Sequence, residues 1–224
     1  MPAYPGAFIT FEGVDGSGKT TQLARLAERL AAESYSVVRA QEPGGTRVGA
    51  EIRKIVLDAA TTDLRAVPEL LLYFASRAQN VEEVIMPALE SGHVVLADRF
   101  TDASMAYQGY GRGLGTEMVL ALERIACRGL KPELTFLIDI DTNTSVERAL
   151  GRNAASEVNE SRFERESREF HERVRDGYLE ISRQDPRRVV VIDGRRTPGE
   201  IAAEIWQLTE GFLAARGVRR GSHV

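Results

Sequence analysis

Short apolar runs alternate along the chain with longer segments in which apolar residues recur at helical spacing. The short runs are rich in β-branched residues and predict strands that are buried on both faces of a sheet. The longer segments predict helices that pack one apolar face against that sheet. The expected strands are Ala7–Phe11, Ser36–Arg39, Val94–Ala97, Leu134–Ile138 and Val189–Ile192. The expected helices are Gly18–Ala32, Arg47–Leu57, Pro68–Leu89, Glu117–Cys127, Thr144–Leu150, Arg165–Ser182 and Pro198–Ala214.

This order of elements predicts one α/β domain with a parallel sheet between two layers of helices, because strand–helix–strand crossovers are right-handed. With 224 residues, the chain has the length of a single domain, which we expect to span residues 1–216. The segment Gly151–Arg162 is polar and without periodicity, so it predicts a surface loop that can serve as a lid. The last segment, Gly217–Val224, predicts a disordered tail.

Composition and charge narrow the possible partners. The formal net charge of −4 gives no clustered positive potential, so we expect neither nucleic acid nor an anionic membrane surface as partner. No apolar run is long enough to cross a bilayer, and the first residues do not resemble a signal or transit peptide. The one cysteine, Cys127, excludes an internal disulfide framework and fits the cytoplasm as the expected location.

One motif points directly to a ligand. The segment Gly13-Val14-Asp15-Gly16-Ser17-Gly18-Lys19-Thr20 matches the P-loop pattern GxxxxGK[ST], between an expected strand and an expected helix. In such a loop the backbone N–H groups surround the phosphates of ATP, the lysine reaches the β- and γ-phosphates, and the threonine hydroxyl can ligate Mg²⁺. The sequence therefore predicts a P-loop NTPase-type α/β/α fold with a five-stranded parallel sheet. A P-loop indicates that the protein binds a nucleotide but does not identify the reaction, so the reaction must be inferred from residues elsewhere in the chain.

Two aspartates compete for a place at the metal. Asp98 and Asp139 each follow an apolar strand, where a Walker-B carboxylate holds Mg²⁺ or a water molecule bound to it. The strand pattern alone leaves both of them open.

Several further segments resemble the bacterial thymidylate kinase family. They are Glu42-Pro43-Gly44-Gly45-Thr46, Glu51-Ile52-Arg53, Phe74-Ala75-Ser76-Arg77, Asp98-Arg99-Phe100, and Ala106-Tyr107-Gln108-Gly109 with Gly111-Arg112-Gly113. Together with the P-loop they cover nearly the whole chain, and they lie at or beyond strand ends, where open α/β sheets bind ligands. The resemblance implies a homodimeric enzyme that transfers the γ-phosphate of ATP to dTMP with Mg²⁺, and it favours Asp98 over Asp139 at the metal.

The resemblance also implies an acceptor site. Arg99 and Arg53 would contact the phosphate of dTMP, and Arg77 would hydrogen-bond the thymine. Tyr73 would stack on the base, and its four-residue spacing from Arg77 puts both on one helix face. Relatives commonly carry an arginine where this chain has Gln41. The implied dTMP-binding residues are Glu42, Pro43, Arg53, Tyr73, Arg77, Arg99, Ser104 and Gln108.

Catalysis is expected to depend on charge compensation and not on a strong general base, because the acceptor phosphate is already largely dianionic near neutral pH. Gly16 stands where some members of the family carry an arginine in the P-loop. The resemblance then implies that Arg152 of the lid is the catalytic arginine, with Arg148 one helical turn before it. It also implies that Asp15 approaches the 3′-hydroxyl of the acceptor. The expected catalytic residues are Lys19, Arg99, Arg152 and Asp15.

Two other functions remain open from the sequence. The first is a kinase for another nucleotide or for a deoxynucleoside. The second is a P-loop regulatory module that holds a nucleotide without turnover.

Overall fold

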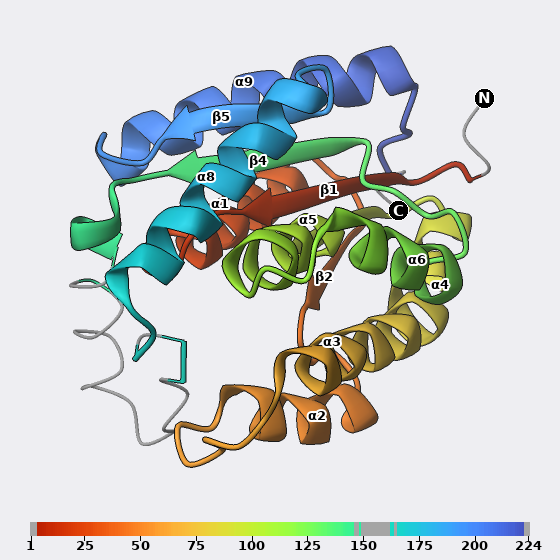
Figure 1. Ribbon diagram of the computed structural model, residues 1–224. Coiled ribbons are helices and arrows are strands. Elements are labelled where there is room, and N and C mark those ends of the chain that lie inside the picture. The colour runs from red at the N-terminus through yellow and green to blue at the C-terminus, as the bar shows by residue number, and fades with distance from the viewer. Residues whose placement is uncertain (1–3, 146–147, 149–161, 164, 222–224) are drawn as a thin grey trace.

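The structure is a computed structural model, and it describes residues 4–145, 148, 162–163 and 165–221. In this part of the chain five strands form one sheet: β1 (Ala7–Glu12), β2 (Val37–Gln41), β3 (Val94–Asp98), β4 (Leu134–Asp139) and β5 (Val189–Asp193). The strand order is β2-β3-β1-β4-β5, and every neighbouring pair is parallel (Figure 1). The predicted α/β fold with a five-stranded parallel sheet is confirmed.

Helices cover both faces of this sheet (Figure 1). On one face lie α1 (Lys19–Ala32) and α9 (Pro198–Arg216), which share a core cluster with the sheet. The other face is covered by α3 (Ala66–Asn80), α6 (Thr116–Ala126) and α8 (Arg168–Gln184), and α2 (Arg47–Leu57) packs against α3. The described helices also include the short α4 (Met86–Glu90) and α5 (Thr101–Ser104) and two π-helical segments, η1 (Val81–Ile85) and η2 (Met105–Gly111).

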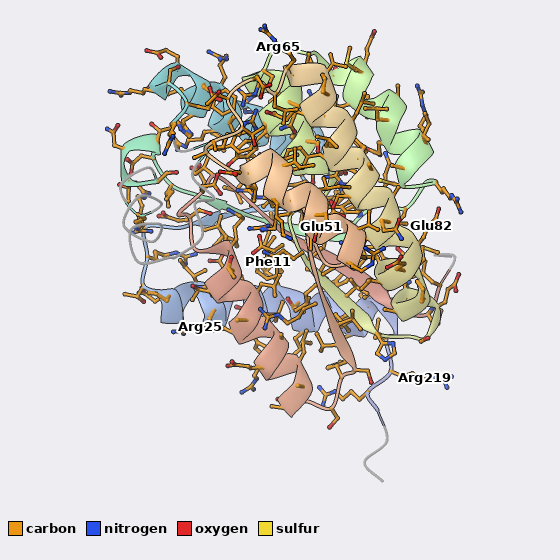
Figure 2. The ribbon with its side chains drawn as sticks, turned by 90° about the horizontal axis from the view of Figure 1, so that it is seen from below. Phe11, Arg25, Glu51, Arg65, Glu82 and Arg219 are labelled. Atoms are coloured by element: carbon orange, nitrogen blue, oxygen red, sulfur yellow. The ribbon has the colours of Figure 1, made fainter. Side chains whose placement is uncertain are left out.

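Successive side chains of β1 point to opposite faces of the sheet, so this strand contributes to two core clusters. Ile9 and Phe11 point toward α1 and α9, whereas Phe8 points to the opposite face and packs edge-on against Phe100, with 5.0 Å between ring centroids. Figure 2 shows Phe11 inside the molecule, while charged side chains such as Arg25 project outward. Full burial of a side chain of this size stabilises the fold by about 1.5–3 kcal/mol, so both core faces hold the P-loop strand in place.

The helix expected at Pro68–Leu89 is divided into α3, the π-helical η1 and α4. Pro87 lies in the first turn of α4 and cannot donate a helical hydrogen bond, and its ring would crowd the carbonyl group four residues earlier. The π-helical turn η1 lies directly before α4, so the regular helical bonding is interrupted where the proline enters the helix.

The sequence pattern did not predict α5 and η2. Most of their side chains are buried, including the polar Thr101, Asp102, Ser104 and Gln108. Such a segment has no separate apolar and polar faces, so its hydrophobic periodicity carries no helical signal.

The expected lid and the expected tail differ in how much of each the structure describes. Residues 151–161 of the expected lid lie outside the described residues, as does part of the expected helix Thr144–Leu150, of which positions 144, 145 and 148 are helical. The tail expected to be disordered from Gly217 differs in its described part, 217–221. Val218 is buried in the core cluster of α1 and α9, and the Gly221 N–H donates to the Ser34 carbonyl at 2.7 Å. Val218, two residues after the end of α9, thus ties this segment to the fold. Among the described residues, no helix is both long and apolar enough to cross a membrane.

Candidate active site

The P-loop connects β1 to α1 and depends on glycine at its tightest points. Gly13 has a φ of 132°, and a Cβ atom there would lie 2.4 Å from the carbonyl oxygen of Ile138. Gly18 directly precedes α1 with a φ of 98°. Side chains at these positions would strain the backbone, whereas glycine leaves the N–H groups at the start of α1 free to surround an anion. The Lys19 Nζ atom donates to the Val14 carbonyl at 2.8 Å.

A cavity of about 640 Å³ opens in front of this loop and brings most of the predicted site residues together. Val14 and Ser17 are buried behind the loop surface, and neither they nor Gly13 line the cavity. Arg152 lies outside the described residues. The predicted residues that line the cavity are Asp15, Gly16, Gly18, Lys19, Thr20, Glu42, Pro43, Arg53, Tyr73, Arg77, Asp98, Arg99, Ser104, Gln108 and Arg148.

Asp15 and Arg99 form an ion pair in the middle of the cavity, with 2.6 Å between Oδ1 and Nη2. The Tyr107 hydroxyl donates to the other Asp15 oxygen at 2.8 Å, and the Arg99 guanidinium lies over the Tyr107 ring at 4.9 Å from its centroid. Burial acts to raise the pKa of Asp15, but Arg99 and Lys19 outweigh it and hold that pKa below its ordinary value. Asp15 is therefore a fixed negative charge that aligns Arg99.

The backbone also holds Arg99 in place. Its φ of 73° is unusual for a residue other than glycine, and such strain persists only where surrounding contacts enforce it. The Arg99 N–H donates to the Phe11 carbonyl at 3.0 Å, and the next N–H, that of Phe100, donates to the buried Glu12 carboxylate at 2.7 Å. The Tyr178 hydroxyl connects the two, since it donates to Glu12 at 2.9 Å and accepts from Arg99 at 2.9 Å. The guanidinium is thus held by β1, the P-loop and α8 together.

The structure separates the two rival aspartates. The Thr20 hydroxyl donates to Asp98 Oδ2 at 2.6 Å, so the P-loop hydroxyl and the carboxylate at the end of β3 lie side by side at the cavity. Both carboxylate oxygens of Asp139 instead accept from Arg175, each at 2.7 Å, and Asp139 does not line the cavity. Oxygen ligands such as those of Thr20 and Asp98 are the kind that Mg²⁺ prefers. The described residues contain no cluster of three or more His, Cys, Asp or Glu side chains suited to a metal.

At the far end of the cavity, Arg77 is only 1% exposed and is held by three contacts. Its Nε donates to Glu42 at 2.5 Å, one terminal nitrogen donates to the Ser104 hydroxyl at 3.0 Å, and the other donates to the Phe100 carbonyl at 2.9 Å. A guanidinium has five N–H groups, so donors remain for a ligand in the cavity. Because Ser104 accepts from Arg77, the Ser104 hydroxyl proton is free to turn toward the same ligand.

Some residues of the site were not predicted as parts of it. Tyr107 stands inside a motif that was recognised, but its link to Asp15 crosses 92 residues of sequence. Tyr178 lies on α8, 166 residues from its partner Glu12, and no local pattern marks either residue. Phe163, which also lines the cavity, follows the lid directly and packs edge-on against Tyr107, with 5.4 Å between ring centroids. Its place next to the lid was the one available signal.

The fold and this cavity define a P-loop nucleotide-binding protein. Beyond the P-loop, several arginines line the cavity. The thymidylate kinase family model matches residues 11–205, and the chain therefore belongs to the thymidylate kinase family. It is 50% identical over 201 residues to the thymidylate kinase of Pelobacter propionicus, covering 89% of this chain and 92% of that protein. It is 45% identical over 212 residues to the thymidylate kinase of Desulfovibrio desulfuricans, covering 94% and 98%. The crystal structure of thymidylate kinase from Ehrlichia chaffeensis aligns with a TM-score of 0.74 at 34% identity, covering 92% of this chain and 99% of that one.

Proposed function

We propose that the protein transfers the γ-phosphoryl group of ATP to dTMP and releases ADP and dTDP. The observation that carries the proposal is a continuous cavity that is lined by the P-loop at one end and by Arg77 at the other, with Arg99 between them. Two nucleotides placed end to end in it would meet at Arg99. Membership of the thymidylate kinase family favours this reaction over both a kinase for another nucleotide and a P-loop module without turnover.

On the donor side, ATP would bind to the loop Gly13-Val14-Asp15-Gly16-Ser17-Gly18-Lys19-Thr20. Thr20 and Asp98 would hold Mg²⁺ or its bound water, and their adjacent oxygens support this assignment. Bound there, the ion would offset the negative charge of the ATP phosphates. Lys19 adds a positive charge at the same phosphates.

The pKa of Lys19 leads to a prediction about ATP binding. Burial, together with the nearby charge of Arg99, lowers the pKa of its ammonium group to about 8 in the free protein. Phosphates bind the protonated form, so ATP affinity should fall by up to about tenfold per pH unit above pH 8. Isothermal titration calorimetry at pH 7, 8 and 9, in buffers of different ionisation enthalpy, measures both this fall and the proton uptake. In Lys19→Arg, whose guanidinium stays charged, affinity should not fall in this way; an affinity of the wild type that stays level from pH 7 to 9 would contradict the prediction.

On the acceptor side, the dTMP phosphate would lie against Arg99 and Arg53, and its base between Tyr73 and Arg77. Glu42 and Pro43 would shape the pocket, and Ser104 and Gln108 would complete the recognition of the base. Asp15, already fixed by Arg99 and Tyr107, would approach the 3′-hydroxyl of the sugar. Gln41 also lines the cavity and supplies a neutral amide where relatives commonly have an arginine.

Phosphoryl transfer passes through a loose transition state, so alignment and positive charge matter more than proton abstraction. Lys19, in the P-loop, and Arg99, in the middle of the cavity, would supply this charge. Arg152 of the lid would supply the rest when the loop closes over the nucleotides, in the manner of an arginine finger. Arg148, at the cavity wall, supports an approach of the lid from this side.

A panel of acceptors tests the proposed reaction. With ATP and Mg²⁺, ADP release should be fast with dTMP and much slower with dUMP, dCMP, dGMP and thymidine. Coupled spectrophotometry measures the release for each acceptor. Preference for another acceptor would replace the proposed substrate, and ADP release that does not depend on any acceptor would exclude the transfer.

We further propose that the protein is a homodimer and works in the cytoplasm. The buried, unpaired Cys127 suits a reducing compartment. Exposed large apolar residues gather on α2, α3 and α6, which pack side by side. Such a surface on one molecule can be covered by the same surface of a second copy. The exposed residues are Val48, Ile55, Val67, Leu71, Met118, Leu120 and Ile125.

The dimer can be tested with a charge placed on this surface. Leu71→Glu is expected to convert the dimer into a monomer, because a carboxylate would be buried without a partner in the interface. Light scattering after size-exclusion chromatography measures the mass. Val191→Glu is the matched control, since Val191 is as exposed, at 44% against 49% for Leu71, but lies on β5. A monomeric wild type, or an unchanged mass of the Leu71 variant, would exclude this interface.

A further inference from the structure

Glu69 is a fully buried carboxylate on α3 that does not itself line the cavity. Its Oε1 accepts from Gln108 Nε2 at 2.8 Å and from Arg112 Nε at 3.2 Å. Its Oε2 accepts from Arg112 at 3.1 Å and from Arg162 at 2.5 Å. Both carboxylate oxygens are thus engaged by donors, three of which come from guanidinium groups.

The two arginines keep this group an acceptor. Arg162 is anchored by donation to the carbonyls of Val56 at 3.0 Å and Thr61 at 3.2 Å. The Arg112 guanidinium lies over the rings of Phe163 and Phe170. A carboxylate between two guanidinium groups offers lone pairs and no proton, so any amide beside it must turn its NH₂ group toward it.

This arrangement decides which end of the Gln108 amide faces the cavity. Gln108 lines the cavity, and its nitrogen is committed to Glu69. No group in the described part of the chain donates to its amide oxygen. The oxygen is therefore the atom that Gln108 presents to a ligand.

We propose that Glu69 is a positioning residue that fixes the Gln108 amide with its oxygen toward the acceptor base, and so selects a base whose facing edge carries an N–H donor. Thymine has such a donor at N3, whereas cytosine has an acceptor there and would meet the Gln108 oxygen without a proton between them. A site built to hydrogen-bond one partner discriminates strongly against an analogue that leaves its buried polar group unpaired. The inference rests on the proposed function, because it takes dTMP as the acceptor.

The test is the ratio of kcat/KM for dTMP to kcat/KM for dCMP in the wild type and in Glu69→Gln. The variant side chain has one oxygen for the two arginines and an NH₂ group that can face Gln108, which allows the Gln108 amide to turn over. The ratio is expected to fall at least about tenfold, through a higher KM for dTMP and better use of dCMP. If Glu69 only neutralised the arginines, both acceptors would lose equally and the ratio would stay constant, which would overturn the proposal.

Arg112→Ala is the matched control, because it disturbs the same cluster but leaves Glu69 bonded to Gln108 and paired with Arg162. Its ratio should match that of the wild type even where its activity is lower. A fall as large as that of Glu69→Gln would assign the effect to the packing of the cluster and overturn the proposal. Turnover of dTMP by the wild type tests the proposed function separately.

A neutron structure of the wild-type complex with dTMP shows the orientation of the Gln108 amide directly, even if Glu69→Gln fails to fold. The amide deuterons of Gln108 should point to Glu69, and its oxygen should face the pyrimidine. The opposite orientation would overturn the proposal.

Discussion

Replacing Arg99 with alanine is expected to lower kcat/KM for dTMP by about 10²- to 10³-fold, the loss typical of one preorganised charge-stabilising donor. The guanidinium lies between the P-loop and the half of the cavity proposed to hold the acceptor, where charge would develop during transfer. Its strained backbone and its contacts with Asp15, Tyr107 and Tyr178 fix it before any substrate arrives. No reorganisation is then needed at the moment of reaction. Steady-state kinetics with dTMP varied at saturating ATP measures the effect.

Two control variants separate the loss of the Arg99 charge from indirect effects of the substitution. Arg175→Ala removes an arginine that pairs with Asp139 at the end of the neighbouring strand β4, outside the cavity lining, and should leave kcat/KM within about threefold of the wild type. Asp15→Asn in the Arg99→Ala background removes the carboxylate left without its partner, so it recovers the part of the loss caused by that charge. Full recovery in this double variant would show that Arg99 serves only to neutralise Asp15, contrary to the role assigned to it.

The strands and the P-loop could be predicted from the sequence because their signals are local. An apolar run followed by GxxxxGK[ST] sets strand, loop and helix within about twenty residues, and the structure has β1 and α1 in those places. Thr20 and Arg77 could be placed near the cavity because each stands inside a short motif that follows a strand or lies on a helix. The structure brings both to the cavity wall.

The buried partners could not be predicted in the same way. Glu12, Tyr178 and Glu69 look like ordinary strand-end or helix residues in the sequence, and each acquires its meaning from a partner far along the chain. Glu69 lies 93 residues from Arg162 and 39 from Gln108, so the amide orientation follows only from three-dimensional packing. Arg162 ends the polar segment expected to form a lid, and the structure shows it as a counter-ion of Glu69.

The same limit explains why two strand-end aspartates looked equivalent. Asp98 and Asp139 end the strands β3 and β4, which flank β1 on either side, and both carboxylates therefore lie near the P-loop edge of the sheet. What separates them is which partner each one meets: a P-loop hydroxyl for Asp98 and an arginine of α8 for Asp139. Residue type and strand position alone carry no information about this choice.

Asp98→Asn is accordingly expected to lower kcat by about 10²- to 10³-fold and to raise the Mg²⁺ concentration needed for half-maximal rate. An amide is a weaker ligand than a carboxylate for a hard cation. The ion is expected to lower the free energy of the charged transition state by several kcal/mol. Initial rates across a range of Mg²⁺ and Mn²⁺ concentrations, at fixed ATP and dTMP, measure both quantities.

Asp139→Asn is the matched control and should keep kcat and the Mg²⁺ requirement within about threefold of the wild type. The substitution removes the ion pair with Arg175, whose side chain is 34% exposed. The free energy of unfolding should therefore change by only about 1 kcal/mol or less. Thermal melts of both variants check that neither loses its fold. A larger kinetic effect at Asp139 than at Asp98 would move the metal to the other side of β1, and with it the direction from which the acceptor meets the γ-phosphate.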